Sequence, residues 1–255
     1  MINAVTSKDN KVLKLVRSLH KKKGRLQSGL YFAEGVRLVK EALNFANDKI
    51  EFLIISETYQ KQNTEFLSGL DKIIYVTPDK NFAEICDTET PQGIGAVLKM
   101  PAKSTPDFNK MNYVLCLDGV SEPGNMGTII RTAEAAGIDS ICLLNDCVDI
   151  YSPKVVRSAM GSVFRMNFVF GSSEIITNLK EADFTVLATA LYNSEPIEET
   201  TVIGKRAIVI GNEAHGVSEE IIGLCDKSVR IDMKGSVESL NAAVAAGITM
   251  YILKV

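Results

Sequence analysis

The sequence predicts an α/β protein that ends in a parallel sheet covered by helices on both faces. Three observations support this class. Apolar, strand-like runs alternate with helical patterns along the whole chain. In the second half these runs are continuously apolar, as in 113–117 and 208–210, which is typical of parallel strands buried on both faces. The chain has 255 residues, of which 46% are hydrophobic and 23% charged, so it can form two domains with cores of their own.

The first hundred residues predict a small α/β domain, residues 1–100. A helix with apolar positions Val12, Leu15, Val16 and Leu19 can be capped by Thr6 or Ser7, and it ends at residues 21–24. The elements expected after it are strand 30–33, a helix over 36–43, strand 52–55, a helix near 61–70, strand 73–76, a helix that begins at Pro78, and strand 94–98.

Residues 101–112 contain two prolines and few apolar side chains, which indicates a linker. The second domain, residues 113–255, then repeats strands and helices in the order of a doubly wound parallel sheet. Its expected elements are strand 113–117, helix 126–136, strand 141–144, helix 153–160, strand 163–170, helix 173–181, strands 184–188 and 207–210, helix 218–225, strand 228–231 and a last helix over 240–252.

Composition excludes several classes of protein. No apolar run reaches the roughly 18 residues that a membrane span needs, and the N-terminus lacks the apolar region of a signal peptide. The five cysteines form no C-x-x-C pair and there are two histidines, so we expect reduced core thiols and no metal site. These features predict a cytoplasmic protein that has no membrane partner.

Charge is distributed unevenly, although the net charge is only −3. Residues 1–30 hold eight basic side chains and one acidic one, which would suit an arm that contacts nucleic-acid phosphates. A solvated lysine-rich helix explains the same pattern, so charge alone leaves both interpretations open. The basic side chains are Lys8, Lys11, Lys14, Arg17, Lys21, Lys22, Lys23 and Arg25.

Common nucleotide-binding and hydrolase motifs are absent from the sequence. Gly211 and Gly216 have the spacing of a P-loop, but Val217 occupies the position of its essential lysine. No strand is followed by G-x-G-x-x-G, and no G-x-S-x-G is present.

Three glycine-bearing segments remain as candidates for chemistry: SEPGNMGTIIRTAEAAG, IVIGNEAHGVSEEI and IDMKGSVESLNAAVAAG. Each has an ordinary structural explanation when taken alone. Asn125 can be a helix cap, Arg131 can form a surface salt bridge, and the last segment can be a serine-capped core helix. Strand, glycine loop and helix N-terminus in the second segment would also form a corner suited to an anion or a nucleotide.

Taken together, in this order and spacing, the segments resemble the three motifs of the SpoU/TrmH-type RNA ribose 2′-O-methyltransferases of the SPOUT class. YFAEGVRLVKEAL and TETPQGIGAVLKM resemble that family's ribosomal-protein-like substrate-binding domain. The resemblance implies a C-terminal trefoil knot, S-adenosylmethionine as cofactor, a homodimer and an RNA substrate, with large-subunit rRNA favoured over tRNA and no DNA. The alternatives are the same chemistry on tRNA, or a catalytically silent RNA-binding assembly factor with the same fold.

The resemblance also assigns roles to residues. The cofactor pocket would be lined by Gly211, Ile231 and Leu240, with Asn212, Glu213, Gly216, Met233 and Ser239 beside them. The active-site positions would be Asn125, Arg131, Glu213, Ser239 and Asn241. Ala214 replaces a glycine common in the second motif, which would matter only if that position needs a positive φ.

The implied reaction is attack of a ribose 2′-hydroxyl on the sulfonium methyl group, without a metal. A guanidinium is charged at all ordinary pH values, so we expect Arg131 to stabilise the developing alkoxide and to grip the neighbouring phosphate. Glu213, or the phosphate itself, is then the expected proton acceptor.

Overall fold

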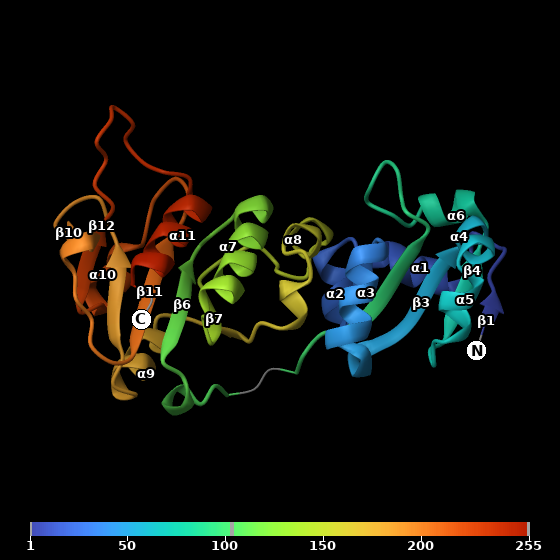
Figure 1. Cartoon of the computed structure of the whole chain (residues 1–255), viewed down its shortest axis with the longest axis horizontal. Coiled ribbons are helices and arrows are strands. Elements are labelled where there is room, and N and C mark those ends of the chain that lie inside the picture. The colour runs from blue at the N-terminus through green and yellow to red at the C-terminus, as the bar shows by residue number, and fades with distance from the viewer. Residues whose placement is uncertain (1, 103–104, 254–255) are drawn as a thin grey trace. The chain divides into compact units, whose positions relative to one another are not determined.

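The computed structural model describes residues 2–102 and 105–253, which form two compact units (Figure 1). The N-terminal unit consists of residues 2–102 and 149–165. The C-terminal unit consists of residues 105–148 and 166–253.

The N-terminal unit is built on a five-stranded mixed sheet in the order β1-β4-β3-β5-β2. β4 runs parallel to β1 and β3, whereas β5 runs antiparallel to β3 and β2. The strands are β1 (Ile2–Ala4), β2 (Leu30–Glu34), β3 (Ile50–Ser56), β4 (Ile74–Thr77) and β5 (Ile94–Lys99). The helices are α1 (Lys11–Ser18), α2 (Lys22–Ser28), α3 (Val36–Phe45), η1 (Asn47–Lys49), α4 (Glu57–Gln62), α5 (Thr64–Ser68) and α6 (Asp79–Ala83).

The basic N-terminal segment is part of this unit's core and is not a free arm. β1 pairs with β4, and the apolar face of α1 buries Leu13, Val16 and Leu19. Asn10 caps α1 by accepting a hydrogen bond from the Val12 N–H, so Thr6 and Ser7 were wrong as caps. The expected helix end at residues 21–24 is the start of the second helix, α2.

Residues 149–165 lie in the N-terminal unit, although the sequence placed them in the second domain. They contain α8 (Pro153–Ser158) and η3 (Ser162–Phe164). Three ion pairs hold them there: Asp149 with Arg25, Arg157 with Asp87, and Arg165 with Glu41. The rings of Tyr31 and Tyr151 also pack against each other, with centroids 4.8 Å apart and planes tilted by 41°. The expected strand 163–170 is therefore shorter, because its first residues belong to η3.

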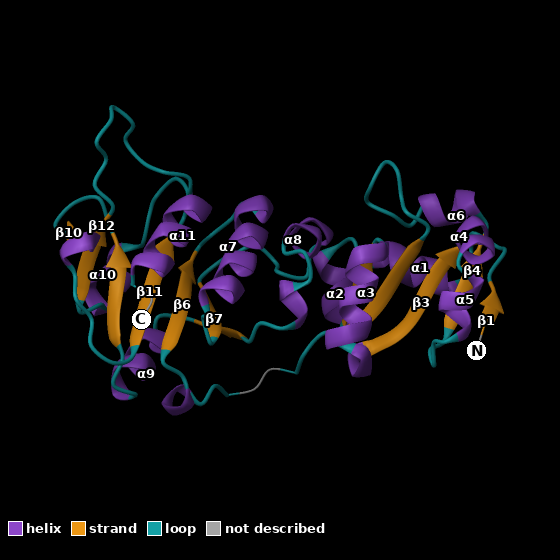
Figure 2. Ribbon diagram, viewed as in Figure 1, coloured by secondary structure: helices purple, strands orange, loops and turns teal. Residues whose placement is uncertain are grey.

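The C-terminal unit contains a seven-stranded sheet in the order β10-β12-β9-β11-β6-β7-β8, and every pair is parallel (Figure 2). The predicted parallel sheet is thus confirmed. Its strands are β6 (Tyr113–Asp118), β7 (Ser140–Leu144), β8 (Phe168–Gly171), β9 (Thr185–Thr189), β10 (Glu195–Pro196), β11 (Arg206–Gly211) and β12 (Lys227–Arg230). Its helices are η2 (Phe108–Lys110), α7 (Pro123–Ala136), α9 (Glu174–Glu181), η4 (Ile197–Glu199), α10 (Glu219–Leu224) and α11 (Ala242–Ile252).

Both faces of this sheet are covered. Val114 and Cys116 of β6 belong to a core cluster that includes apolar residues of α9 and α10. The alternate residues Leu115 and Leu117 are also fully buried and point to the opposite face. α7 and α11 lie side by side over the sheet in Figures 1 and 2, and α11 contacts β11.

The strand order reverses between β6 and β11, which are hydrogen-bonded neighbours near the middle of the sheet. In open α/β sheets a ligand crevice forms outside the carboxyl ends of the strands at such a reversal. The register pairs Asp118 with Gly211 at those ends. The fold therefore brings the segments that follow β6 and β11 to one edge of the sheet.

Candidate active site

A cavity of about 720 Å³ lies at this edge of the sheet, and residues that follow β9, β11 and β12 line it together with the start of α11. All the residues expected to bind the cofactor lie in its wall. These are Gly211, Asn212, Glu213, Gly216, Ile231, Met233, Ser239 and Leu240. Asn125, Arg131 and Asn241 do not line the cavity.

The loop after β11 forms one wall and turns back on itself very tightly. Asn212 and Gly216 exchange two backbone hydrogen bonds of 2.9 Å. A Cβ atom on Gly211 would lie 2.0 Å from the Gly216 carbonyl carbon, so only glycine fits there. Gly216 has φ +70°. Ala214 has no positive φ, so replacement of the family glycine imposes no backbone strain.

Two side chains fix this loop to the end of β6. The Asn212 side-chain amide donates to the Gly119 carbonyl at 2.8 Å. The buried Asp118 carboxylate accepts from the Ser218 N–H at 2.8 Å and from the Asn145 side chain. Sequence reasoning missed Asp118, although a carboxylate at the end of the otherwise apolar strand YVLCLD was the available signal.

Asn125, Glu213 and Asn241, which belong to the three different segments, form a continuous chain of hydrogen bonds. The Asn241 Nδ2 donates to Asn125 Oδ1 at 2.9 Å, and the Asn125 Nδ2 donates to Glu213 Oε1 at 3.0 Å. Asn241 Oδ1 also caps α11 by accepting from the Ala243 and Val244 N–H groups at 2.9 and 3.3 Å. The structure thus brings three of the five predicted active-site residues together.

The Glu213 carboxylate accepts three more hydrogen bonds from the segment before α7. Oε2 accepts from the Ser121 N–H at 3.1 Å and the Ser121 hydroxyl at 3.0 Å, and Oε1 accepts from the Glu122 N–H at 3.1 Å. Partial burial raises the pKa of Glu213, but hydrogen bonds from Asn125 and these backbone groups outweigh it and lower the pKa to about 2. Glu213 is therefore a carboxylate at neutral pH.

Arg131 and Ser239 do not join this chain. Both side chains are exposed and, within residues 2–102 and 105–253, neither has a hydrogen-bond or ion-pair partner. Arg131 lies six residues after Asn125 in α7, which is about 9 Å along the helix axis. The next residue, Thr132, packs against Gly247 of α11, so Arg131 lies beside the α7–α11 pair.

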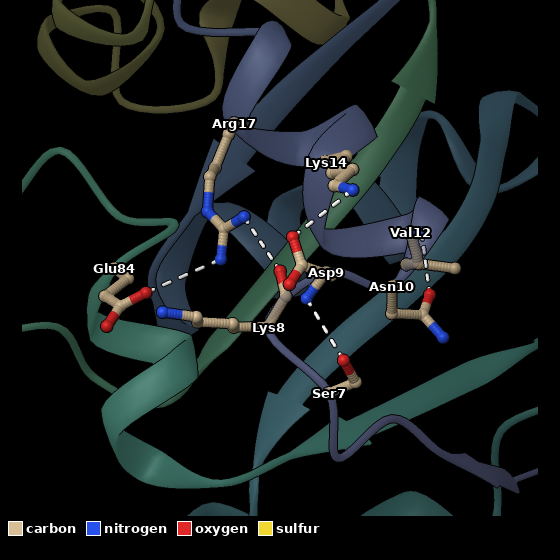
Figure 3. Close-up of polar contacts among 8 residues, drawn as sticks. All are labelled: Ser7, Lys8, Asp9, Asn10, Val12, Lys14, Arg17 and Glu84. Atoms are coloured by element: carbon tan, nitrogen blue, oxygen red, sulfur yellow. Dashed lines mark hydrogen bonds and ion pairs between the residues drawn. The ribbon is translucent and has the colours of Figure 1, made fainter.

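The basic residues of segment 1–30 differ in their contacts, and Figure 3 shows those of Lys8, Lys14 and Arg17. Arg17 donates to the Lys8 carbonyl at 2.9 Å and approaches Glu84 at 3.5 Å, and Lys14 pairs with Asp9 at 3.3 Å. Lys8, Lys11, Lys21, Lys22 and Lys23 have exposed side chains.

Arg25 differs from the other basic residues. It is 3% exposed and donates to Asp149 at 2.6 and 2.9 Å and to the Leu19 carbonyl at 2.6 Å. The expectation that Arg25 contacts RNA was therefore wrong in this structure, because its guanidinium is committed to the core.

The part of the chain that the structure describes carries neither a metal-binding cluster nor a membrane-spanning helix. No group of three or more His, Cys, Asp or Glu side chains is placed to hold a metal ion there. No helix there has the length and apolar character to cross a membrane.

Comparison with known proteins identifies the family. The SpoU rRNA Methylase family matches residues 112–251, and the MRM3-like substrate binding domain matches residues 10–96. The chain belongs to the SpoU rRNA methylase family. The 23S rRNA (guanosine(2553)-2′-O)-methyltransferase RlmP of Bacillus subtilis is 36% identical over 98% of both chains.

Solved structures of similar proteins agree with this membership in the SpoU family. An AdoMet-bound rRNA methyltransferase from Sinorhizobium meliloti matches 98% of this chain and 97% of its own, with a TM-score of 0.85 and 28% identity. The SpoU methyltransferase AviRb from Streptomyces viridochromogenes, in complex with AdoMet, matches 95% of this chain and 96% of its own, with a TM-score of 0.85 and 26% identity. The predicted family, methyltransferase class and S-adenosylmethionine cofactor are thereby confirmed.

Proposed function

We propose that this protein transfers the methyl group of S-adenosylmethionine to a ribose 2′-hydroxyl in large-subunit ribosomal RNA. The observation that carries the proposal is the hydrogen-bonded chain Asn241–Asn125–Glu213. It joins three segments far apart in the sequence beside a cavity at the carboxyl edge of a parallel sheet. Similarity to RlmP along both whole chains supports rRNA as the substrate. Such a substrate favours a cytoplasmic location.

The cavity suits the cofactor in size and chemistry. Its volume of about 720 Å³ lies within the roughly 300–1,000 Å³ of small-molecule sites. Ile231 and Leu240 offer apolar surface for an adenine ring, while the turn at 211–216 brings backbone groups to the same wall. When bound, S-adenosylmethionine supplies an electrophilic methyl group, which the ribose oxygen receives in exchange for its proton. The protein's part is to bind, orient and exclude water.

We propose that a second copy of the chain completes the site. Arg131 is exposed beside the α7–α11 pair, and α11 also exposes Val244 (50%) and Ile252 (40%). A homodimer that buries these residues would bring Arg131 to the partner's cavity, where its fixed charge would stabilise the developing alkoxide and hold an RNA phosphate. The trefoil-knotted path of the last segment, implied by the sequence resemblance, is part of the same proposal.

Mixing two variants of low activity tests the shared site. In each proposed site, Arg131 comes from one subunit and Asn241 from the other. In a dimer of one Arg131→Ala chain and one Asn241→Asp chain, one of the two sites would therefore contain both native residues. Random exchange should then restore about a quarter of the wild-type rate. No recovery after confirmed subunit exchange would place both residues in one subunit's site.

The exposed lysines of the N-terminal unit are proposed to contact RNA phosphates. Deleting residues 1–25 would also remove Leu13, Val16 and Leu19 from the core, so substitutions are the proper test. Combined Lys21→Gln, Lys22→Gln and Lys23→Gln changes should raise the KM for RNA and flatten its salt dependence, with cofactor affinity unchanged. Lys110→Gln, an exposed lysine of the C-terminal unit, is the matched control.

Labelled methyl transfer onto unmodified 23S rRNA and tRNA tests the proposed function. Digestion to nucleosides should place the label on a ribose of 23S rRNA, and Arg131→Ala should abolish it. RNA binding without transfer would identify an assembly factor. Label confined to tRNA would change the substrate, and label on a base would overturn ribose chemistry.

A further inference from the structure

We propose that Glu213 is a fixed anion that orients the amides of Asn125 and Asn241 toward the RNA, and that it does not accept the proton of the ribose hydroxyl. This inference rests on the proposed function and assigns Glu213 a positioning role in it. Of the two proton acceptors expected from sequence, Glu213 and the neighbouring RNA phosphate, it removes Glu213 and leaves the phosphate to take the ribose proton.

The orientation of the chain is fixed at its α11 end by groups that can only donate. The backbone N–H groups of Ala243 and Val244 lie 2.9 and 3.3 Å from Asn241 Oδ1. That atom must therefore be the amide oxygen, and the Asn241 nitrogen must face Asn125. Asn125 Oδ1 consequently accepts from Asn241, and the Asn125 nitrogen faces Glu213.

At the other end of this hydrogen-bonded chain, every acceptor position of the Glu213 carboxylate already receives a hydrogen bond. Each carboxylate oxygen offers about two acceptor positions. Oε1 is occupied by the Glu122 N–H and Asn125, and Oε2 by the N–H and hydroxyl of Ser121. A proton arriving at either oxygen would have to displace a donor. The low pKa of Glu213, about 2, agrees with this saturation.

The consequence is that the side-chain amides of Asn125 and Asn241 hold their remaining N–H groups in fixed directions. An amide nitrogen carries two hydrogens, and the chain uses one from Asn125 and one from Asn241. One N–H of each side chain therefore remains for an incoming ligand. Such donors bind oxygen acceptors, and the substrate supplies these as ribose and phosphate oxygens. Because charge-assisted hydrogen bonds are the stronger ones, the Glu213 anion holds the Asn125 amide directly, and through Asn125 it supports the orientation that the α11 backbone gives to Asn241.

Glu213→Gln gives a sharp test, because both carboxylate oxygens face a backbone N–H. Whichever oxygen becomes the glutamine NH₂ group would oppose the N–H of Ser121 or Glu122. We expect kcat on 23S rRNA to fall about 100-fold, as for other losses of alignment, while the Kd for S-adenosylmethionine changes less than about threefold. Glu220→Gln, an exposed glutamate of α10, should match wild type.

The pH profile separates positioning from proton transfer. If Glu213 only positions, the residual kcat of Glu213→Gln should parallel wild type between pH 5 and 9. If Glu213 is the base, hydroxide has to accept the ribose proton in the Glu213→Gln variant. The kcat of the variant would then rise about tenfold per pH unit. A profile of that slope would overturn the inference. So would a kcat unchanged by Glu213→Gln, or a rate loss matched by an equal loss of cofactor affinity.

A measurement that needs no activity keeps this test separate from the proposed function. The Glu213 carboxyl carbon can be titrated by NMR in the full wild-type chain without RNA or cofactor. A pKa below about 3 is expected, and a pKa between about 6 and 8 would overturn the inference. If wild type fails to methylate rRNA while the pKa is low, the proposed function fails and the anion stands.

Discussion

Gly211→Ala is the substitution with the most severe steric consequence at the cofactor cavity. The new Cβ would lie 2.0 Å from the Gly216 carbonyl carbon and the Val217 nitrogen, and 2.2 Å from the Gly216 oxygen. Carbon atoms in contact sit about 3.5–4.0 Å apart, so the backbone would have to move by about 1.5 Å. No side-chain rotation can relieve this overlap, because every atom involved belongs to the main chain.

The energetic cost combines overpacking with loss of the loop's own hydrogen bonds. Overpacking costs about 1–3 kcal/mol, and main-chain neighbours favour the upper end. Separating Asn212 from Gly216 breaks two hydrogen bonds worth about 1 kcal/mol each. We therefore expect a loss of about 3–5 kcal/mol and a fall in Tm on the order of 10 °C. Because this loop lines the cavity, cofactor affinity should fall at least about 100-fold.

Urea denaturation and calorimetric titration with S-adenosylmethionine measure the two effects. Gly223→Ala is the matched control, since Gly223 also lines the cavity but has no heavy atom within 4 Å of its Cβ position. As a helix residue it should gain up to about 1 kcal/mol on substitution. If Gly211→Ala unfolds within about 1 kcal/mol of wild type and still binds the cofactor, the steric argument fails.

Three further predictions follow from individual contacts. Asn241→Asp keeps the α11 cap but loses the donor to Asn125. The free energy of unfolding, measured by thermal unfolding, should therefore stay within about 0.5 kcal/mol of wild type, while the rate of methyl transfer falls at least tenfold. Equal rates of methyl transfer would show that this hydrogen bond plays no part in the mechanism. Arg25→Ala leaves Asp149 partly buried without its ion-pair partner, so the free energy of unfolding measured in urea should fall by about 3–5 kcal/mol. A fall of less than about 1 kcal/mol would mean that the ion pair contributes no more than an exposed one. The Glu213 pKa is lowered from 4.5 to about 2, so its contribution is complete above pH 4.5 and disappears as the pH falls toward 2. The unfolding free-energy difference between wild type and Glu213→Gln should shrink over that range, and a difference that persists at pH 2 would contradict the sign.

The parallel sheet was predictable because its strands are continuous apolar runs in the sequence. Apart from the charged residue at one end, YVLCLD and RAIVIG are apolar on both faces, which is typical of a buried parallel strand. The second short helix was not predictable from lysine-rich residues 21–24. It depends on Gly24, where a Cβ would lie 2.1 Å from the Ser18 carbonyl oxygen, and this close approach to α1 is a tertiary contact.

The active-site chain could be anticipated only in part. Asn125 lies 88 residues from Glu213 and 116 from Asn241, so spacing gives no sign that the three side chains meet. Family resemblance grouped them, but it could not reveal that Glu213 is saturated by donors. That property depends on the backbone N–H groups of Ser121 and Glu122, which any residue type would supply.

Residues 149–165 have a practical consequence for anyone who dissects this protein. The polypeptide crosses between the two units three times, so cutting at the linker does not liberate a self-sufficient catalytic fragment. A fragment starting at residue 105 would still contain residues 149–165, but the core of the N-terminal unit that buries their apolar side chains would be missing. The exposed apolar side chains should make this fragment aggregate. A soluble excision product needs residues 149–165 rewritten as a polar crossover of about a dozen residues, the minimum that parallel neighbours such as β7 and β8 require. The side chains to be replaced are Ile150, Tyr151, Val155, Val156, Val163 and Phe164.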